Sequence, residues 1–294
     1  MAGMTFAGAH TALVTPFRDG QFDESAFRRL IQDQLQGGVA GIVPVGTTGE
    51  SPTLDHEEHL KVIETAVHAA EKRCLVIAGT GSNSTAEAVD LTVAAENLGA
   101  DAALLVAPYY NKPSQEGLYR HFSAIAEAVK IPLVLYSIPG RCGIEIGVET
   151  VARLARDYSN VVAIKEAGGS VERVNQLRGA LPDAFEILSG DDSLTLPFMS
   201  VGAVGVVSVA SNIIPAEVSA LVRNYLDGNH AAALKIHHKY YPLFKDLFLE
   251  PNPVPVKFAL ARLGKAAAEV RLPLCEMSST NAMRVGETLT SVGI

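Results

Sequence analysis

One lysine, Lys165, lies within the apolar run 161–165, whose composition is typical of a buried strand. Burial disfavours the charged ammonium, lowers the pKa of the lysine and leaves a free amine that can attack a carbonyl carbon. The other nine lysines lie in polar, helical or loop segments where a solvated charge is easily placed. This pattern favours Schiff-base chemistry at Lys165. The alternative is a structural lysine that pairs with a buried carboxylate or reaches out of the strand end.

A glycine-rich turn, GTTGES at 46–51, follows the second apolar run. The hydroxyls of Thr47 and Thr48, together with backbone N–H groups, could hold a carboxylate, particularly if the turn leads into a helix. Taken alone, the same residues are also typical of a structural turn with a helix cap. The turn lacks the lysine of a phosphate-binding P-loop, so we do not predict a nucleotide site.

Two further polar residues follow the run 133–138. The phenol of Tyr136 could move protons at an imine, and Arg141 could clamp a carboxylate in bidentate fashion. With Lys165, they indicate an aldolase-type reaction of an α-keto acid, in which the imine acts as an electron sink. Each has a structural alternative, since Tyr136 could be a tyrosine at the edge of the core and Arg141 a surface arginine. No cluster has the spacing of metal ligands, so no metal site is predicted.

Eight apolar runs alternate with segments of helical periodicity, which indicates an α/β protein with a parallel sheet covered on its outer face. We predict a (β/α)8 TIM barrel, in which catalytic groups gather at the carboxyl ends of the strands. The alternative, an open doubly wound sheet, lacks support because no GxGxxG follows the first run. The runs are 9–14, 41–45, 75–78, 102–107, 133–138, 161–165, 185–188 and 204–209, and the helical segments are 23–36, 55–72, 84–98, 117–129, 148–158, 170–181 and 192–201.

Beyond the eighth run the pattern predicts helices at 215–226, 230–248 and 255–263. A barrel does not need about the last seventy residues of this chain. We therefore divide the chain into a catalytic barrel, 1–226, and a C-terminal helical region, 227–294, entered near Asp227.

Composition excludes several classes of function. The net charge of −8 and the absence of a Lys/Arg run argue against nucleic-acid binding. No stretch is long and apolar enough to span a membrane, and the N-terminus does not resemble a signal peptide. Cys74, Cys142 and Cys275 are odd in number and far apart, as expected for reduced thiols in a cytoplasmic protein.

Five motifs are spread along the chain: GTTGES at 46–51, YSIPGRCG at 136–143, IKEAGG at 164–169, LSGDD at 188–192 and EPNPVPVK at 250–257. Together they resemble the dihydrodipicolinate synthase family of pyruvate-dependent class I aldolases, in the N-acetylneuraminate lyase superfamily. The resemblance covers nearly the whole chain and implies a barrel with a three-helix C-terminal region, assembled as a homotetramer of two tight dimers. It implies condensation of pyruvate with L-aspartate-4-semialdehyde, the first committed step towards diaminopimelate and lysine, without a cofactor.

Carried over by position, the resemblance implies that Lys165 forms the Schiff base. It implies a proton relay through Thr48, Tyr110 and Tyr136, in which Tyr110 reaches into the site of a neighbouring subunit. Within this chain alone, Tyr109 and Tyr110 could instead pack under a loop.

The resemblance also implies substrate-binding residues. Thr47, together with Thr48, is expected to bind the pyruvate carboxylate, and Arg141 to bind the carboxylate of the semialdehyde. Gly190 and Val207 are expected to contribute backbone carbonyls near the site. The chain departs from the usual family pattern at Ser137, where Asn is common, and at Cys142, where Thr is common. Neither position carries a proposed chemical step.

A site for inhibition by L-lysine is the last implication of the resemblance. Glu87 could pair with the amine of the effector, and His56 and His59, three residues apart on one helix face, could both point into one cavity. The histidine pair could also be a solvated helix face or, less in keeping with its surroundings, a metal site. The implied residues are Ser51, Pro52, His56, His59, Asn83, Glu87 and Tyr109.

Two other functions fit parts of the pattern. A sialic acid or 2-keto-3-deoxy sugar acid lyase would share the lysine, the tyrosine and the glycine-rich turn, but Arg141 favours a short carboxylated aldehyde. A barrel that only senses a metabolite would have no reason to combine a buried amine, a phenol and a carboxylate clamp.

Overall fold

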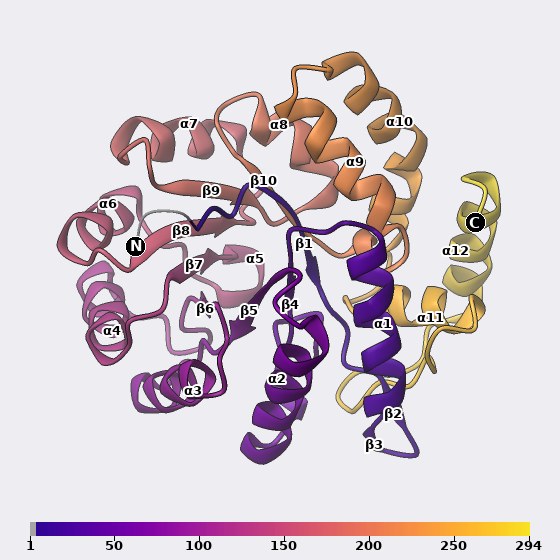
Figure 1. Ribbon diagram of the computed structural model, residues 1–294, viewed down its shortest axis with the longest axis horizontal. Helices are drawn as coiled ribbons and strands as arrows, with labels where there is room; N and C mark the ends of the chain where they lie inside the picture. The colour runs from indigo at the N-terminus through magenta and orange to yellow at the C-terminus, as the bar shows by residue number, and fades with distance from the viewer. Residues whose placement is uncertain (1–3) are drawn as a thin grey trace.

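The computed structural model describes residues 4–294 and contains a closed barrel of eight parallel strands (Figure 1). β1 pairs with both β10 and β4, which closes the barrel and excludes the open sheet. Each predicted apolar run overlaps one strand of the barrel, so the (β/α)8 prediction is confirmed. The strands are β1 (Gly8–Ala12), β4 (Gly41–Val43), β5 (Leu75–Gly79), β6 (Ala102–Val106), β7 (Leu133–Ser137), β8 (Val161–Glu166), β9 (Glu186–Ser189) and β10 (Gly205–Ser208).

Helices surround the barrel, and polar caps set where many of them begin. Asp55 accepts a hydrogen bond from Glu58 N at 2.8 Å, and Ser84, Ser114 and Ser170 cap other helices. The outer helices are α1 (Glu24–Gln36), α2 (His56–Ala70), α3 (Thr85–Asn97), α4 (Gln115–Ala128), α6 (Val148–Asp157), α7 (Val171–Ala180), α8 (Thr195–Met199) and α9 (Pro215–Leu226). Smaller elements are the hairpin β2 (Phe17–Arg18) and β3 (Gln21–Phe22), α5 (Pro139–Cys142), and the 3₁₀ turns Ser51–Thr53, Asp192–Leu194 and Ala210–Asn212.

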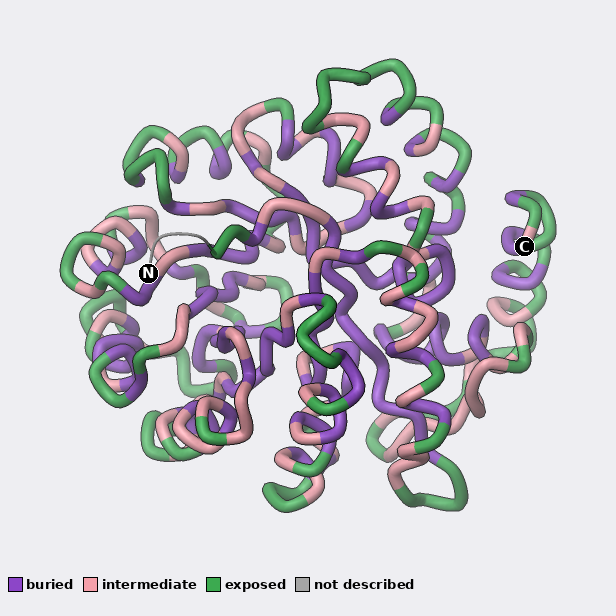
Figure 2. Tube along the Cα trace, in the orientation of Figure 1, coloured by how far each residue is buried: buried purple, intermediate pink, exposed green. Residues whose placement is uncertain are grey.

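The core has two layers, because successive side chains of a strand point to opposite faces. Leu133 and Leu135 pack outward against the helices, whereas Val134 and Tyr136 join a separate cluster inside the barrel. Figure 2 shows the strands and the inward helix faces as buried. The same alternation on β8 places Lys165, two residues after the inward-facing Ala163, inside the barrel.

The C-terminal region consists of α10 (His230–Asp246), α11 (Val254–Arg262) and α12 (Ser279–Ser291). The predicted helix 215–226 is α9, the last helix of the barrel, whereas α12 was not predicted from periodicity. Gly286 lies in the middle of α12, where a Cβ would come within 3.3 Å of the Arg262 guanidinium. Packing on α10 and α11 therefore stabilises a helix whose sequence has a low intrinsic helix propensity at this position. Within residues 4–294, no helix has the length and hydropathy needed to cross a membrane.

Candidate active site

Lys165 is buried inside the barrel, with its side chain against Tyr136. Only 6% of the residue surface is exposed, and Nζ lies 4.0 Å from the centroid of the Tyr136 ring. The two residues are register partners on the neighbouring strands β8 and β7. Burial lowers the pKa of Lys165 to about 7, while Asp192 acts in the opposite direction and Arg141 in the same direction. A substantial fraction of this amine is therefore neutral and nucleophilic near pH 7.

Asp192 is a charged residue of the site that the sequence alone did not single out. Its Oδ2 accepts hydrogen bonds from Val209 N and Ala210 N, both at 3.0 Å, and the residue is buried. Burial raises its pKa to about 6, and its carboxylate raises the pKa of Lys165. Nothing in the LSGDD motif distinguishes Asp192 from its neighbour Asp191, so only the fold reveals which one approaches the amine.

The turn that follows β4 presents backbone donors. Across residues 4–294, no hydrogen bond engages the N–H groups of Thr47 or Thr48, whereas Gly49 N and Glu50 N bond to carbonyls within the turn. Val45 and Glu50 bracket the turn with φ values of 49° and 54°, a left-handed conformation that is unfavourable for residues with a Cβ. The turn enters a short 3₁₀ helix, and α2 begins only at His56, so an anion would be held by the turn itself.

The two threonines of the turn have different partners. Thr47 and Tyr136 line the same cavity, and the side chain of Thr47 opposes the rise of the tyrosine pKa to about 12 that burial causes. The hydroxyl of Thr48 accepts a hydrogen bond from Asn252 Nδ2 at 2.9 Å. Of the two threonines, Thr47 is therefore the one that acts on Tyr136 within this chain, and the relay through Thr48 that the resemblance implied stays a prediction.

A cavity of about 220 Å³ opens beside these residues. Thr47, Tyr136 and Arg141 line it, whereas Lys165 is not among its lining residues and lies behind the Tyr136 ring. Arg141 is exposed at this cavity, with Nη2 3.4 Å from the Asn252 carbonyl oxygen. Cys142 also lines it, but burial raises the pKa of its thiol to about 11, so the thiol is protonated and inert at neutral pH.

Gly190 and Val207 lie at the inner end of the site. A Cβ at position 190 would come within 2.6 Å of the Ala167 Cβ and 3.1 Å of Lys165 Cε, so the close packing around the lysine requires glycine. Val207 is buried in the interior cluster and pairs with His10 of β1. Gly190 therefore lies beside the lysine at the carboxyl end of β9, and the expected role of the two backbone carbonyls stays a prediction.

Tyr110 stands apart from the other predicted relay residues. It is 89% exposed and has a left-handed backbone with φ of 73°. Among residues 4–294, no hydrogen bond joins its side chain to Tyr136 or Thr47, and its exposure shows that it does not pack under a loop. Its reach into the site of a neighbouring subunit stays a prediction.

Glu87 is the centre of the predicted lysine site. Its Oε1 lies 2.6 Å from His56 Nε2, and its Oε2 accepts a hydrogen bond from Ser82. The hydrogen bonds from Ser82 and His56 lower the pKa of Glu87, so the carboxylate is ionised at neutral pH. His59 is buried, with Nε2 2.9 Å from the carbonyl oxygen of Gly79. The two histidines therefore engage different partners, and neither lines the 220 Å³ cavity.

The remaining residues of this predicted site lie between Glu87 and the cavity. Asn83 Nδ2 donates to the Tyr109 carbonyl at 3.2 Å, and Ser51, Pro52 and Tyr109 line the same cavity as Tyr136. The predicted lysine site and the predicted active site therefore share a wall.

The expectation that every lysine except Lys165 is solvated is wrong for Lys257. This side chain is 1% exposed, and its ammonium donates to the buried carboxylate of Glu50. Burial lowers the pKa of Lys257 to about 8, and Glu50 opposes that shift. The sequence did not reveal this burial. Lys257 lies in a predicted helix, and only the fold shows that α11 packs the face that carries Lys257 onto the barrel.

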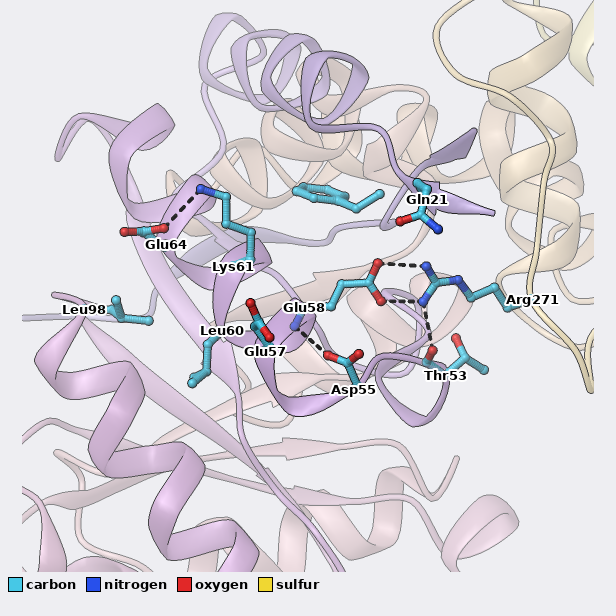
Figure 3. A pocket seen from close by; sticks show the side chains of 11 residues that line it. Gln21, Thr53, Asp55, Glu57, Glu58, Leu60, Lys61, Glu64, Leu98 and Arg271 are labelled. Atoms are coloured by element: carbon cyan, nitrogen blue, oxygen red, sulfur yellow. Dashed lines mark hydrogen bonds and ion pairs between the residues drawn. The ribbon is translucent and has the colours of Figure 1, made fainter. Parts of the chain in front are cut away.

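A larger groove, of about 720 Å³, lies beside the C-terminal segment and contains none of the predicted site residues (Figure 3). Most of its charged residues form ion pairs with one another. Arg271 donates to both oxygens of Glu58, and Lys61 Nζ lies 3.2 Å from Glu64 Oε2. Both cations that line this groove are paired with carboxylates, whereas Arg141 in the smaller cavity has no ion-pair partner within residues 4–294, so we assign the chemistry to the smaller cavity.

Comparison with known proteins agrees with this geometry. The model of the dihydrodipicolinate synthetase family matches residues 5–292. The chain belongs to this family. The 4-hydroxy-tetrahydrodipicolinate synthase of Syntrophus aciditrophicus is 52% identical over 289 residues, 98% of this chain and 99% of that protein. The solved structure of the synthase from Methylacidiphilum fumariolicum SolV has a TM-score of 0.97 at 56% identity, covering 98% of this chain and 96% of that one.

Two other solved relatives of the family contain ligands. The enzyme from Cyanidioschyzon merolae, 42% identical with a TM-score of 0.95, has lysine bound, and the match covers 98% of both chains. The chloride-inhibited enzyme from Acinetobacter baumannii, 44% identical with a TM-score of 0.96, is complexed with pyruvate, and the match covers 99% of this chain and 100% of that one.

Proposed function

We propose that the protein is a 4-hydroxy-tetrahydrodipicolinate synthase, a lyase that condenses pyruvate with L-aspartate-4-semialdehyde in lysine and diaminopimelate biosynthesis. The observation that carries the proposal is the buried Lys165 amine against the Tyr136 ring, in a chain that matches this family over nearly its whole length. A biosynthetic role of this kind places the enzyme in the cytoplasm.

In the first step, the neutral amine of Lys165 attacks the keto carbon of pyruvate, and loss of water from the carbinolamine gives an imine. The imine withdraws electrons from the adjacent methyl group, which loses a proton to form an enamine. The enamine carbon then attacks the aldehyde. Lys165 lies deep in the barrel, so this sequence of steps begins in a site from which bulk water is largely excluded.

The proton transfers are assigned to Tyr136 with Thr47. The contact between these two side chains supports Thr47, and not Thr48, as the second member of the relay. Thr48 is assigned to the pyruvate carboxylate, together with the unbonded backbone N–H groups of the turn. Tyr110 extends the relay from a neighbouring subunit, which makes the active assembly an oligomer, and we propose the homotetramer of the family.

The second substrate is assigned to Arg141. Its exposed guanidinium lines the cavity, and a planar fork of donors suits a carboxylate. A sugar acid lyase would need polar groups for a row of hydroxyls, whereas the side chains at 104, 106 and 138 on the cavity wall are apolar. The small, largely apolar cavity therefore favours the short aldehyde over a sugar acid.

We further propose that L-lysine inhibits the enzyme by binding beside Glu87. The ionised carboxylate offers a partner for the amine of the effector, and the wall shared with the active site offers a route for coupling. The lysine-bound relative from Cyanidioschyzon merolae supports this assignment.

A coupled assay tests the proposed function. Pyruvate and aspartate semialdehyde are supplied with dihydrodipicolinate reductase, and NADPH oxidation is followed. Turnover that disappears in Lys165→Ala supports the synthase. If pyruvate is trapped on Lys165 by borohydride without turnover of the semialdehyde, the aldolase chemistry stands and the second substrate is wrong. Without any trapping, the Schiff-base mechanism itself is excluded.

A further inference from the structure

The turn 46–50 needs support from outside itself. Val45, which precedes the turn, and Glu50, its last residue, have left-handed backbones. Such a conformation persists only where the surrounding structure holds it. Part of that support comes from the N-terminal side, where Thr15 Oγ1 donates to the Gly49 carbonyl at 2.7 Å. The remaining contacts come from the C-terminal region, more than 200 residues away in the sequence.

Asn252 makes the contact nearest to the chemistry. Its Nδ2 donates to Thr48 Oγ1 at 2.9 Å, and its backbone carbonyl accepts from Arg141 Nη2 at 3.4 Å. Asn252 therefore lies between the two groups assigned to the two substrate carboxylates. It is 6% exposed, and within residues 4–294 its Oδ1 has no hydrogen-bond partner. A buried amide with one unsatisfied atom is unfavourable for stability, which suits a residue retained for its action on Thr48.

Lys257 anchors the same segment at the other end of the turn. Its ammonium donates to Glu50 and, at 2.9 Å, to the Glu269 carbonyl, and it lies 4.1 Å from the Phe17 ring centroid. This pairing neutralises the one carboxylate of a turn that is assigned to receive an anion. Without it, the charge of Glu50 would oppose binding of a second carboxylate nearby.

A third contact extends the support beyond the turn. Arg271 N donates to Glu50 Oε2 at 3.0 Å, and its guanidinium bonds to the Thr53 carbonyl and the Glu58 carboxylate (Figure 3). The segment from the turn to the start of α2 is thus held from three positions of the C-terminal region. That region therefore supports the active-site turn directly, although the sequence suggests a separate extension.

We infer that Asn252 is a positioning residue for pyruvate, whose side-chain amide fixes the hydroxyl of Thr48 in the orientation that receives the carboxylate. The inference rests on the proposed function of the turn and adds a residue from the C-terminal region to it. Asn252 acts through Thr48, so its removal changes how much pyruvate is needed and leaves the chemistry at Lys165 intact.

The test measures the pyruvate concentration that gives half-maximal trapping on Lys165 by borohydride, read by intact-protein mass spectrometry. Four proteins form a cycle: the wild type, Asn252→Ala, Thr48→Val and the double variant. Asn160→Ala is the matched control, because Asn160 is also a buried asparagine and its Nδ2 donates to the carbonyls of Ala126 and Val129, both at 3.0 Å. Thermal stability is recorded for each protein.

Asn252→Ala is expected to raise the half-saturating pyruvate concentration roughly tenfold, with maximal trapping unchanged. In the Thr48→Val background the same change should add less than about twofold, because its target is already absent. Asn160→Ala should lower stability and leave pyruvate binding unaltered. Fully additive effects, or an Asn252→Ala variant that resembles Asn160→Ala, would overturn the inference.

If Asn252→Ala does not fold, Asn252→Asp preserves the volume and replaces the donating amide nitrogen with an oxygen. It is expected to raise the half-saturating pyruvate concentration as well, and a folded Asn252→Asp with wild-type pyruvate binding overturns the inference. The measurement uses pyruvate alone. If the semialdehyde proves to be the wrong second substrate, the inference about Asn252 therefore still stands. Absence of trapping in the wild type would instead refute the proposed function itself.

Discussion

Lys165 and Tyr136 are register partners on adjacent strands, and Nζ of the lysine lies 4.0 Å from the centroid of the tyrosine ring. Both side chains point into the barrel because each occupies an inward position of the two-residue strand period. The ring covers the amine on the cavity side, so burial of Lys165 and access of substrate depend on the same residue.

Replacing Lys165 with alanine is expected to abolish pyruvate trapping and to lower kcat by about 10³-fold or more, because the nucleophile is lost. The variant should fold, since it removes a buried amine that forms no ion pair among residues 4–294. Lys257→Ala is the informative comparison, because it leaves the Glu50 carboxylate buried without its partner and should lower the free energy of unfolding by about 3–5 kcal/mol. Kinetics and thermal unfolding of both variants measure these effects. Equal destabilisation of the two would contradict the distinction.

The rate of pyruvate trapping should rise with pH, with a midpoint near the pKa of about 7 that burial imposes on Lys165. Below that pH the amine is protonated and cannot attack the keto carbon. Asp192 raises the pKa of Lys165, so Asp192→Asn should move the midpoint to lower pH. Trapping rates across a pH series test both points. A midpoint near the ordinary lysine value, or an upward shift in Asp192→Asn, would be inconsistent with this site.

Separate valine substitutions should distinguish the two threonines. Thr47→Val removes the hydroxyl that contacts Tyr136 and should lower kcat by about 10²-fold, the scale of general acid–base assistance. Thr48→Val should mainly raise the KM for pyruvate. Steady-state kinetics decide between them, with serine at each position as the control that restores the hydroxyl. If Thr48→Val lowered kcat and Thr47→Val did not, the relay would pass through Thr48.

Arg141→Ala should raise the KM for the semialdehyde by about 10- to 100-fold through loss of a charge-assisted contact. Imine formation with pyruvate should be preserved. Arg120→Ala is a suitable control, because that guanidinium is exposed and pairs with Glu116 at 2.9 Å on an outer helix. If both substrates were affected equally, the role assigned to Arg141 would be wrong.

Millimolar L-lysine is expected to reduce turnover, and Glu87→Gln should weaken this inhibition by about tenfold with little change in kcat, because the charge that pairs with the effector is removed. Inhibition curves for the wild type, Glu87→Gln and the remote control Glu116→Gln measure the effect. If L-lysine did not change the turnover rate of the wild type, the proposed regulation would be wrong.

Some of the site follows from strand geometry. An apolar run that contains a lysine predicts an inward amine, and Tyr136 follows from the same period on the neighbouring run, so both can be found without a structure. Asp192 could not be found in this way, because two consecutive aspartates differ in nothing but the direction in which the backbone presents them. The boundary between residues 226 and 227 stays a prediction, and Asn252 and Lys257, which lie beyond it, contact the active-site turn.

The sequence by itself determined the barrel, the strand that carries Lys165 and the turn with its two threonines, because these depend on local periodicity and on the order of neighbouring segments. Only the tertiary structure decided which threonine contacts Tyr136, that Lys257 is buried with Glu50, and that Asn252 reaches Thr48. These contacts join segments up to 207 positions apart. No local pattern encodes them, because they arise only when the chain closes its barrel and packs the C-terminal helices against it.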